Sequence, residues 1–261
     1  MRFPLPACGN DNHASAHMKN VLILGATSAI AHEVAKLYAD EQAHLFLVAR
    51  NEFKLETIAK DLIVRGAKVT SGVANFHDFS SHPRLLEQIK EKLGNIDVVL
   101  LAYGSLGNQA ESEKNISVAL QEIETNFLTA FSLLSLLAHI LEAQGSGTLA
   151  VISSVAGDRG RQSNYIYGTA KGALNIFLQG LRNRLYKKGV HVLTIKPGFV
   201  DTPMTTHLKK GFLFSSSQKV GNDIYKAIEE KEDVLYTPQF WRAIMFVIRN
   251  IPEALFKRLN L

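Results

Sequence analysis

Residues 21–40 read VLILGATSAIAHEVAKLYAD, and this stretch decides the fold. Residues 21–24 are all apolar, so they form a short strand with no polar face. Gly25 and small residues then lead into Ala29–Asp40, where apolar side chains recur at helical spacing. A strand that is apolar on both faces is typical of a parallel sheet covered by helices on both sides.

The same alternation of strand and helix continues along the chain. Further strands are expected at 43–49, 68–73, 96–102, 148–153, 190–196 and 234–236. Helices are expected at 52–65, 83–93, 112–143, 165–187 and 219–231. The pattern predicts a doubly wound α/β fold of three layers, with about seven parallel strands. This domain spans 19–238; residues 1–18 are expected to be a flexible tail, and 239–261 a C-terminal amphipathic extension.

Composition excludes several classes of protein. The chain has 261 residues and a single cysteine, Cys8, which excludes a disulfide framework and suits a reducing compartment. The nine histidines show no metal-ligand spacing, so we expect no metal site. The net charge is +5 and the pI about 9.2, but the basic residues are spread out without interleaved aromatic residues. We therefore expect a mildly basic cytoplasmic enzyme and no nucleic-acid partner.

The turn after the first strand suits a dinucleotide. Backbone N–H groups at the start of a helix bind phosphate, and small side chains let the backbone approach it. The usual pattern is G-x-x-x-G-x-G, of which only Gly25 is kept, because Ala29 and Ala31 fill the other places. A plain small-residue turn between strand and helix is the alternative reading.

Arg50 indicates which dinucleotide binds. It follows the second strand, and positions 42–51 contain no acidic residue that would bind the ribose 2′-hydroxyl of NAD. The guanidinium group suits the 2′-phosphate of NADP. We therefore favour NADP(H) over NAD(H), against the alternative that Arg50 is a solvated surface charge.

Tyr167 and Lys171 are the main catalytic candidates. Their i, i+4 spacing places the phenol and the ammonium group on one face of a helix. A free tyrosine has a pKa near 10, and a nearby cation is expected to lower that pKa. Tyr167 then becomes a usable general acid or base. An exposed helical pair is the alternative reading.

The surroundings of this pair favour the catalytic reading. Ser154 follows one predicted strand and Pro197-Gly198 follows the next, so both lie at the edge of the sheet where α/β proteins bind ligands. Asn126 lies in the predicted helix after the fourth strand.

Together, Gly25, Asn126, Ser154, the Tyr167–Lys171 pair and Pro197-Gly198 make the chain resemble the short-chain dehydrogenase/reductase family over about residues 19–240. The resemblance implies that Tyr167 exchanges a proton with a carbonyl or alcohol substrate, while the nicotinamide exchanges hydride. It implies that Ser154 holds the substrate oxygen, Lys171 binds the nicotinamide ribose and tunes Tyr167, and Asn126 holds a water that relays protons. The expected cofactor-binding residues are Gly25, Thr27, Ser28, Ala29, Ile30, Arg50, Asn75, Phe76, Ala102, Gly104, Tyr167, Lys171, Pro197, Gly198, Val200 and Thr202.

Two stretches depart from the family's pattern. Leu101-Ala102-Tyr103-Gly104 stands where the family often has Asn-Asn-Ala-Gly, and Asn75 replaces the usual acid near the adenine. The loop 102–109 resembles a branch of the family that includes reductases of 2-keto sugars on polyprenyl phosphate. That resemblance implies a sugar or lipid-linked substrate.

Residues 239–261 mix Trp241 and phenylalanines with four basic residues, and Pro252 splits them into two short helices. This composition suits peripheral contact with the inner surface of the cell membrane. The alternative is a tail that packs on a neighbouring subunit or covers the substrate pocket.

The long helices expected at 112–143 and 165–187 carry Leu133, Leu134, Leu136 and Leu137, and by family analogy we expect a homodimer or homotetramer.

Two other functions remain open on the sequence alone. One is an NAD-linked alcohol dehydrogenase. The other is a regulator that binds a dinucleotide without catalysis, which the substitutions at Ala29, Ala31 and Leu101 allow. The complete set of Asn126, Ser154, Tyr167 and Lys171 argues against the regulator.

Overall fold

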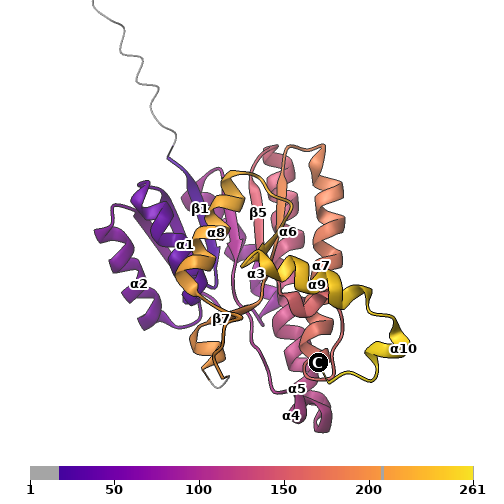
Figure 1. The fold of residues 1–261 in the computed structure, drawn as a ribbon. Coiled ribbons are helices and arrows are strands. Elements are labelled where there is room, and N and C mark those ends of the chain that lie inside the picture. Colours follow the sequence, from indigo (N-terminus) through magenta and orange to yellow (C-terminus); the bar gives the residue numbers. More distant parts are fainter. Residues whose placement is uncertain (1–17, 207–208, 261) are drawn as a thin grey trace, which may run out of the picture.

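The computed structural model describes residues 18–206 and 209–260, and a seven-stranded parallel sheet forms its centre (Figure 1). The strand order is β3-β2-β1-β4-β5-β6-β9, and every pairing is parallel. The strands are β1 Asn20–Leu24, β2 His44–Ala49, β3 Lys68–Val73, β4 Val98–Leu101, β5 Thr148–Ile152, β6 His191–Pro197 and β9 Val234–Thr237. The predicted doubly wound sheet is confirmed.

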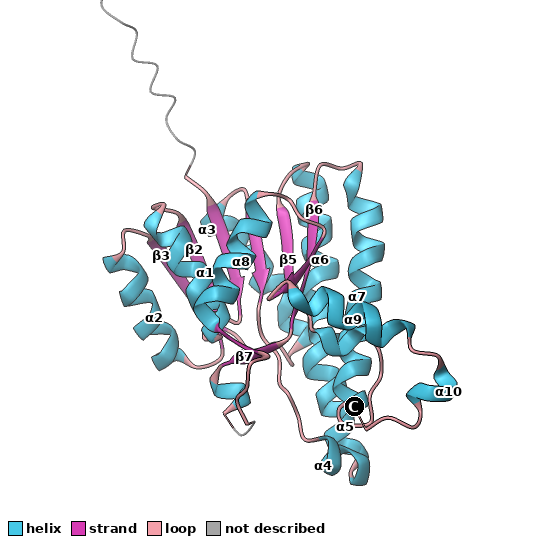
Figure 2. Cartoon of the chain, in the orientation of Figure 1, coloured by secondary structure: helices cyan, strands magenta, loops and turns pink. Residues whose placement is uncertain are grey.

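Helices cover both faces of the sheet, as Figure 2 shows. One layer consists of α1 (Ala29–Asp40), α2 (Glu52–Val64) and α8 (Ser217–Glu229); the other consists of α3 (His82–Leu93), α6 (Thr129–Gln144) and α7 (Tyr165–Tyr186). Side chains of a strand alternate between the two faces. Val21 and Ile23 therefore enter one core, and Leu22 and Leu24 enter the other. This is why β1 has no polar face.

The binding edge of the sheet lies where β1 and β4 meet. The chain builds β2 and β3 on one side of β1, and then crosses to β4 and the remaining strands on the other side. Ligands of such sheets bind outside the carboxyl ends of the strands at this reversal. The Gly25 N–H donates to the Val48 carbonyl at 2.8 Å, and the Ala102 N–H donates to the Leu24 carbonyl at 2.8 Å. These bonds fix two of the predicted cofactor residues at the edge.

The single helix expected at 112–143 is wrong. The segment contains α4 (Gln109–Lys114), α5 (Ile116–Ile123), a π-helical turn η2 (Glu124–Leu128) and then α6. Asn115 separates α4 from α5, and its side-chain oxygen accepts a hydrogen bond from the Ser117 N–H at 3.0 Å. A local cap of this kind begins a new helix without interrupting the apolar periodicity.

Residues 116–144 are the only stretch within 18–206 and 209–260 that is long and apolar enough to cross a membrane by length and composition. The structure packs much of this stretch inside the protein: Leu133, Leu134 and Leu137 are fully buried in the core. Leu136 also packs against that core. These four leucines therefore pack within the chain and do not themselves indicate a subunit interface.

The segment after β6 contains two short strands. It contains β7 (Phe199–Asp201), which pairs with β8 (Phe214–Ser216), and a short 3₁₀ turn η4 (Pro203–Thr205). The other 3₁₀ turns are η1 (Phe79–Ser81) and η3 (Val155–Asp158).

The expected tail, with Cys8, lies outside the described residues apart from Met18.

The C-terminal segment forms two helices, α9 (Phe240–Asn250) and α10 (Glu253–Phe256), as Pro252 predicts. Trp241 and Met245 of α9 are buried against Val155 of η3. Arg159, just after η3, donates to the Ile248 and Ile251 carbonyls, each at 2.7 Å. The extension is thus docked on the domain next to the loop that follows β5 (Figure 1).

Candidate active site

Gly25 shapes the turn between β1 and α1, where the sequence predicts a dinucleotide phosphate. Its φ is +88°, and a Cβ at this position would lie 2.7 Å from the Cβ and the backbone nitrogen of Tyr103. Only glycine fits such a position without strain. The turn therefore depends on Gly25, although the other two glycines of the usual pattern are missing.

The start of α1 fits an anion. Ser28 is the N-cap residue, its side chain makes no capping hydrogen bond, and the first turn carries no acidic residue. The first N–H groups of a helix have no partner within the helix, and the helix dipole makes this end positive. Thr27 and Ser28 are half-buried, and Ala29 and Ile30 open the helix. These residues fit the pyrophosphate of a dinucleotide.

Arg50 lies where the 2′-phosphate of NADP would be expected. It is exposed and directly follows β2, the strand next to β1. Asn51 caps α2 by accepting a hydrogen bond from the Lys54 N–H at 2.9 Å, which fixes the loop that carries Arg50.

Asn75 and Phe76 follow β3 and lie further along the same edge. Asn75 is exposed, and its side-chain oxygen accepts from the His77 N–H at 3.2 Å. The Phe76 ring stacks on Tyr103 with centroids 4.4 Å apart. His82 is fully buried, and its Nε2 lies 3.0 Å from the Phe76 carbonyl oxygen. Phe76 is therefore held in place from both its ring and its backbone.

The structure brings Ser154, Tyr167 and Lys171 together where η3 meets the start of α7. A Cβ on Gly157 would lie 2.5 Å from the Lys171 carbonyl carbon, and one on Gly168 would lie 3.0 Å from the Ala156 oxygen. Backbone of η3 and α7 therefore approaches closely, and side chains at these glycines would prevent it. The Lys171 ammonium lies 5.8 Å from the centre of the Tyr167 ring.

The pKa of Tyr167 differs from the expectation that a neighbouring cation lowers it. Burial raises the pKa of Tyr167 to about 12, against the lowering effect of hydrogen bonding with Ser154. Burial also lowers the pKa of Lys171 to about 8. The Lys171 ammonium donates to the Ile152 carbonyl at 3.2 Å. In the protein alone, burial dominates the pKa of Tyr167, and Tyr167 holds its proton at neutral pH as a general acid must.

Asn126 faces this group from the π-helical turn. Its amide nitrogen donates to the Glu122 carbonyl oxygen at 3.1 Å and to Glu122 Oε1 at 2.8 Å. A Cβ on Gly104 would lie 2.7 Å from Asn126 Oδ1 and 3.6 Å from Lys171 Nζ. Gly104 therefore leaves room for the two side chains to approach each other. Sequence reasoning missed Glu122, which resembles the solvated acidic residues near it.

The segment after β6 forms the remaining wall of the site. Pro197 ends β6, the Gly198 N–H donates to the Thr237 carbonyl at 3.1 Å, Val200 is buried in β7, and Thr202 caps η4. Trp241 of α9 covers this segment, because a Cβ on Gly198 would lie 1.9 Å from Trp241 Nε1. No local pattern in the sequence indicates this contact.

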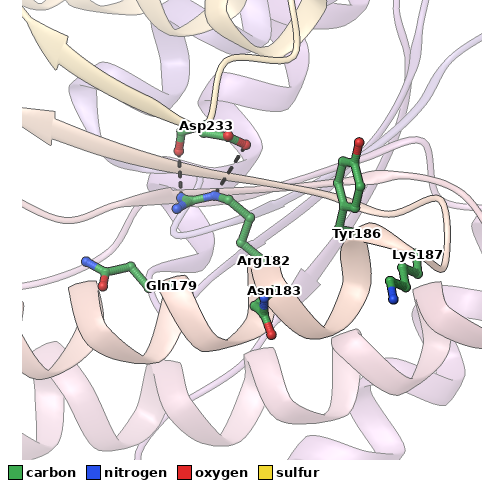
Figure 3. A pocket seen from close by; sticks show the side chains of 6 residues that line it. All are labelled: Gln179, Arg182, Asn183, Tyr186, Lys187 and Asp233. Atoms are coloured by element: carbon green, nitrogen blue, oxygen red, sulfur yellow. Dashed lines mark hydrogen bonds and ion pairs between the residues drawn. The ribbon is translucent and has the colours of Figure 1, made fainter.

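A surface pocket lies away from this site, and the hydrogen bonds of Arg182 in it join two strands. Figure 3 shows it at the C-terminal part of α7, where Arg182 reaches Asp233 just before β9. The Arg182 guanidinium donates to the Val192 carbonyl at 2.9 Å and to the Asp233 carbonyl at 2.6 Å. These bonds join the beginnings of β6 and β9, at the opposite end of the strands from Ser154. In the described part of the chain, no three His, Cys, Asp or Glu side chains are grouped to hold a metal ion.

Known proteins resemble this chain in sequence and fold. A family model described as short chain dehydrogenase matches residues 19–211. An uncharacterized oxidoreductase of Streptomyces coelicolor is 34% identical over 247 residues, covering 94% of this chain and 98% of that protein. A short chain dehydrogenase from Burkholderia cenocepacia, solved with NADP, has a TM-score of 0.79 at 16% identity over 94% of this chain and 98% of its own. An actinorhodin polyketide ketoreductase variant, solved with NADPH, has a TM-score of 0.74 at 22% identity, covering 84% and 95%.

Proposed function

This chain belongs to the short-chain dehydrogenase family of oxidoreductases, and on that basis we propose that it reduces a ketone or aldehyde with NADPH. The observation that carries the proposal is the meeting of Ser154, Tyr167, Lys171 and Asn126 beside the Gly25 turn, at the carboxyl edge of the sheet. A protonated, half-buried phenol next to a hydroxyl group suits a carbonyl oxygen that must gain a proton.

Each residue has a task in the proposed reaction. The bound dinucleotide supplies the hydride that the carbonyl carbon receives. Ser154 donates a hydrogen bond to the carbonyl oxygen and stabilises the charge that develops there. Tyr167 transfers its phenolic proton to that oxygen. Lys171 stabilises the resulting phenolate and binds the nicotinamide ribose, and Asn126 holds the water through which the proton is replaced. Run in reverse, the same residues oxidise an alcohol.

NADP(H) is the proposed cofactor, with support from Arg50 and from the NADP and NADPH named in the two solved neighbours. Replacing Arg50 by Ala should weaken NADPH binding far more than NADH binding, since only NADPH carries the 2′-phosphate. Lys60→Ala, on the exposed surface of α2, is the control for loss of one positive charge. Equal weakening for both dinucleotides would favour the NAD-linked alcohol dehydrogenase instead.

The substrate class is tested by NADPH consumption against a panel of ketones, aldehydes and keto sugars, including lipid-linked keto sugars. Turnover of any of them supports a reductase, and the preferred carbonyl identifies the substrate class. Tight NADPH binding without turnover of any carbonyl or alcohol would favour the non-catalytic regulator.

We also propose that the enzyme is cytoplasmic and touches the inner membrane surface through α9 and α10. The face of α9 opposite Trp241 presents Phe246 and Val247, 71% and 62% exposed, and Arg242 and Arg249 lie on the same helix. Apolar side chains beside basic ones suit an anionic bilayer. Flotation with anionic liposomes tests this: the wild type should float and a Phe246→Gln, Val247→Gln double variant should not. Equal recovery of both in the soluble fraction would contradict it.

A second copy of the chain is the proposed partner for the outer surface of α5 and α7. Ile116 of α5 and Ile176 of α7 are 71% and 72% exposed, and Leu120 of α5 is also exposed. Burying such side chains favours association of subunits. Sedimentation should show a dimer or tetramer that Ile176→Asp dissociates. A monomeric wild type would contradict this proposal.

A further inference from the structure

We propose that Glu122 is a positioning residue of the active site: its carboxylate orients the amide of Asn126 and keeps Lys171 in the ammonium form. This inference rests on the proposed function, since it assigns to Glu122 a task in the same proton transfer. It goes further because Glu122 belongs to none of the motifs that identify the family in this sequence.

The contacts of Glu122 connect it to the site. Its Oε1 accepts from the Asn126 amide at 2.8 Å, and its Oε2 accepts from the Ser105 hydroxyl at 3.0 Å. The Ser105 N–H donates to Asn126 Oδ1 at 3.1 Å. Both ends of the Asn126 amide are therefore fixed, which sets the orientation of its oxygen toward the space at Gly104 and Lys171.

The backbone makes room for this carboxylate. Glu122 is only 7% exposed, and a Cβ on Gly107 would lie 2.5 Å from its Oε2. Gly107 has a φ of +61°, so glycine is favoured there for its backbone as well. The π-helical turn that follows lets the Asn126 side chain reach the Glu122 carbonyl at 3.1 Å. Such turns occur frequently at functional sites.

The charge of Glu122 acts on the buried ammonium. Burial raises the pKa of Glu122, and Lys171, Ser105 and Asn126 each act to lower it. In turn, Glu122 acts to raise the pKa of Lys171, against the effect of burial. A buried ammonium group without a nearby negative charge releases its proton at a lower pH.

Two acidic residues on neighbouring segments are engaged elsewhere, and the phenol next to Lys171 is neutral. Tyr167 of α7 is neutral at the pH where Lys171 titrates, because burial raises the pKa of Tyr167. Asp158 of η3, which packs against α7, forms an ion pair with Lys196 at 2.6 Å. Glu124 of the π-helical turn lies 3.0 Å from His77. Glu122 is therefore the negative charge that acts on Lys171 from α5.

The experiment compares Glu122→Gln with wild type over a range of pH. Glutamine keeps the size and an acceptor for Asn126 but removes the charge. In a plot of kcat against pH, we expect the fall at alkaline pH, the alkaline limb, to move to lower pH by about one unit. KM should change little. Glu91→Gln removes the same charge from an exposed position of α3 and should leave the limb in place. Glu122→Asp keeps the charge, so its limb should stay near that of the wild type even if kcat falls.

A second readout does not depend on turnover. The side-chain carbon signal of Lys171, assigned by its loss in Lys171→Met, is followed by NMR during a pH titration of the protein without cofactor. Lys171 should titrate near pH 8 in wild type and at lower pH in Glu122→Gln. The proposal would be overturned if Lys171 titrated at the wild-type pH in Glu122→Gln. It would also be overturned if the titration of Lys171 shifted equally in Glu122→Gln and in Glu122→Asp. If Glu122→Gln does not fold, Glu122→Asp is titrated alone: a wild-type titration of Lys171 supports the proposal, and a shift of that titration to lower pH overturns it. A wild type that reduces no carbonyl would contradict the proposed function and leave this NMR test intact.

Discussion

Truncating Trp241 should lower both the stability of the protein and its affinity for NADPH. The indole is 3% exposed and packs with Met245 and Val155, and its ring lies directly over Gly198. Replacing a buried tryptophan by alanine costs about 3–5 kcal/mol, since apolar contacts are lost and a cavity is left. That loss is a large part of a typical folding free energy of about 5–15 kcal/mol.

Two control variants separate the loss of the buried ring from the loss of the indole N–H and from the truncation of an exposed side chain on α9. Trp241→Phe keeps a ring in the same place, and the indole N–H that it removes has no hydrogen-bond partner among the described residues. Its cost should be about 1 kcal/mol, without a term for a lost hydrogen bond. Phe246→Ala, on the exposed face of the same helix, should change stability by less than about 0.5 kcal/mol.

The assay is urea denaturation of the three variants and wild type, together with fluorescence titration of NADPH. We expect Trp241→Ala to lose the most stability and to bind NADPH more weakly, because the Pro197-Gly198 segment loses its support. If Trp241→Ala resembled Phe246→Ala in both measurements, the docking of α9 on the site would be refuted.

Three further changes test other parts of the structure. Asp158→Ala leaves the ammonium group of Lys196 buried without its partner, and should cost about 3–5 kcal/mol in urea denaturation; a loss below about 1 kcal/mol would contradict a buried pair. Burial lowers the pKa of His82, so the unfolded chain takes up a proton there first. The free energy of unfolding should therefore decline as pH falls below about 6.5, and less so in His82→Gln; identical pH profiles would show that His82 has no part in it. Gly25→Ala combines a strained φ with a clash against Tyr103 and should weaken NADPH binding at least about tenfold by fluorescence titration; unchanged affinity would place the dinucleotide elsewhere.

The sheet was predictable because burial on both faces leaves a direct mark on the sequence. Strand β2 has six buried residues, and the predicted strand at 43–49 differs from it by one residue. Gly25 and Ser154 follow strand ends and Pro197 ends a strand, so the sequence also places these three residues at one edge of the sheet.

The parts that were missed depend on contacts that leave no periodic pattern in the sequence. Asn126 interrupts the helical bonding of 112–143 through its side chain, which apolar periodicity does not register. Glu122 is one of several acidic residues in its segment, and only the space at Gly107 marks it as buried. Trp241 and Arg159 meet partners far away in the sequence, so neither contact has a local pattern.

The most direct test of the account is the Tyr167→Phe variant, measured for NADPH binding and for reduction of the best carbonyl substrate. Phenylalanine keeps the ring and removes the proton that the account requires. We predict NADPH affinity within about threefold of wild type and a fall in kcat of about 10²–10⁴-fold. A variant that reduces the substrate at the wild-type rate would contradict the assignment of Tyr167 as the proton donor.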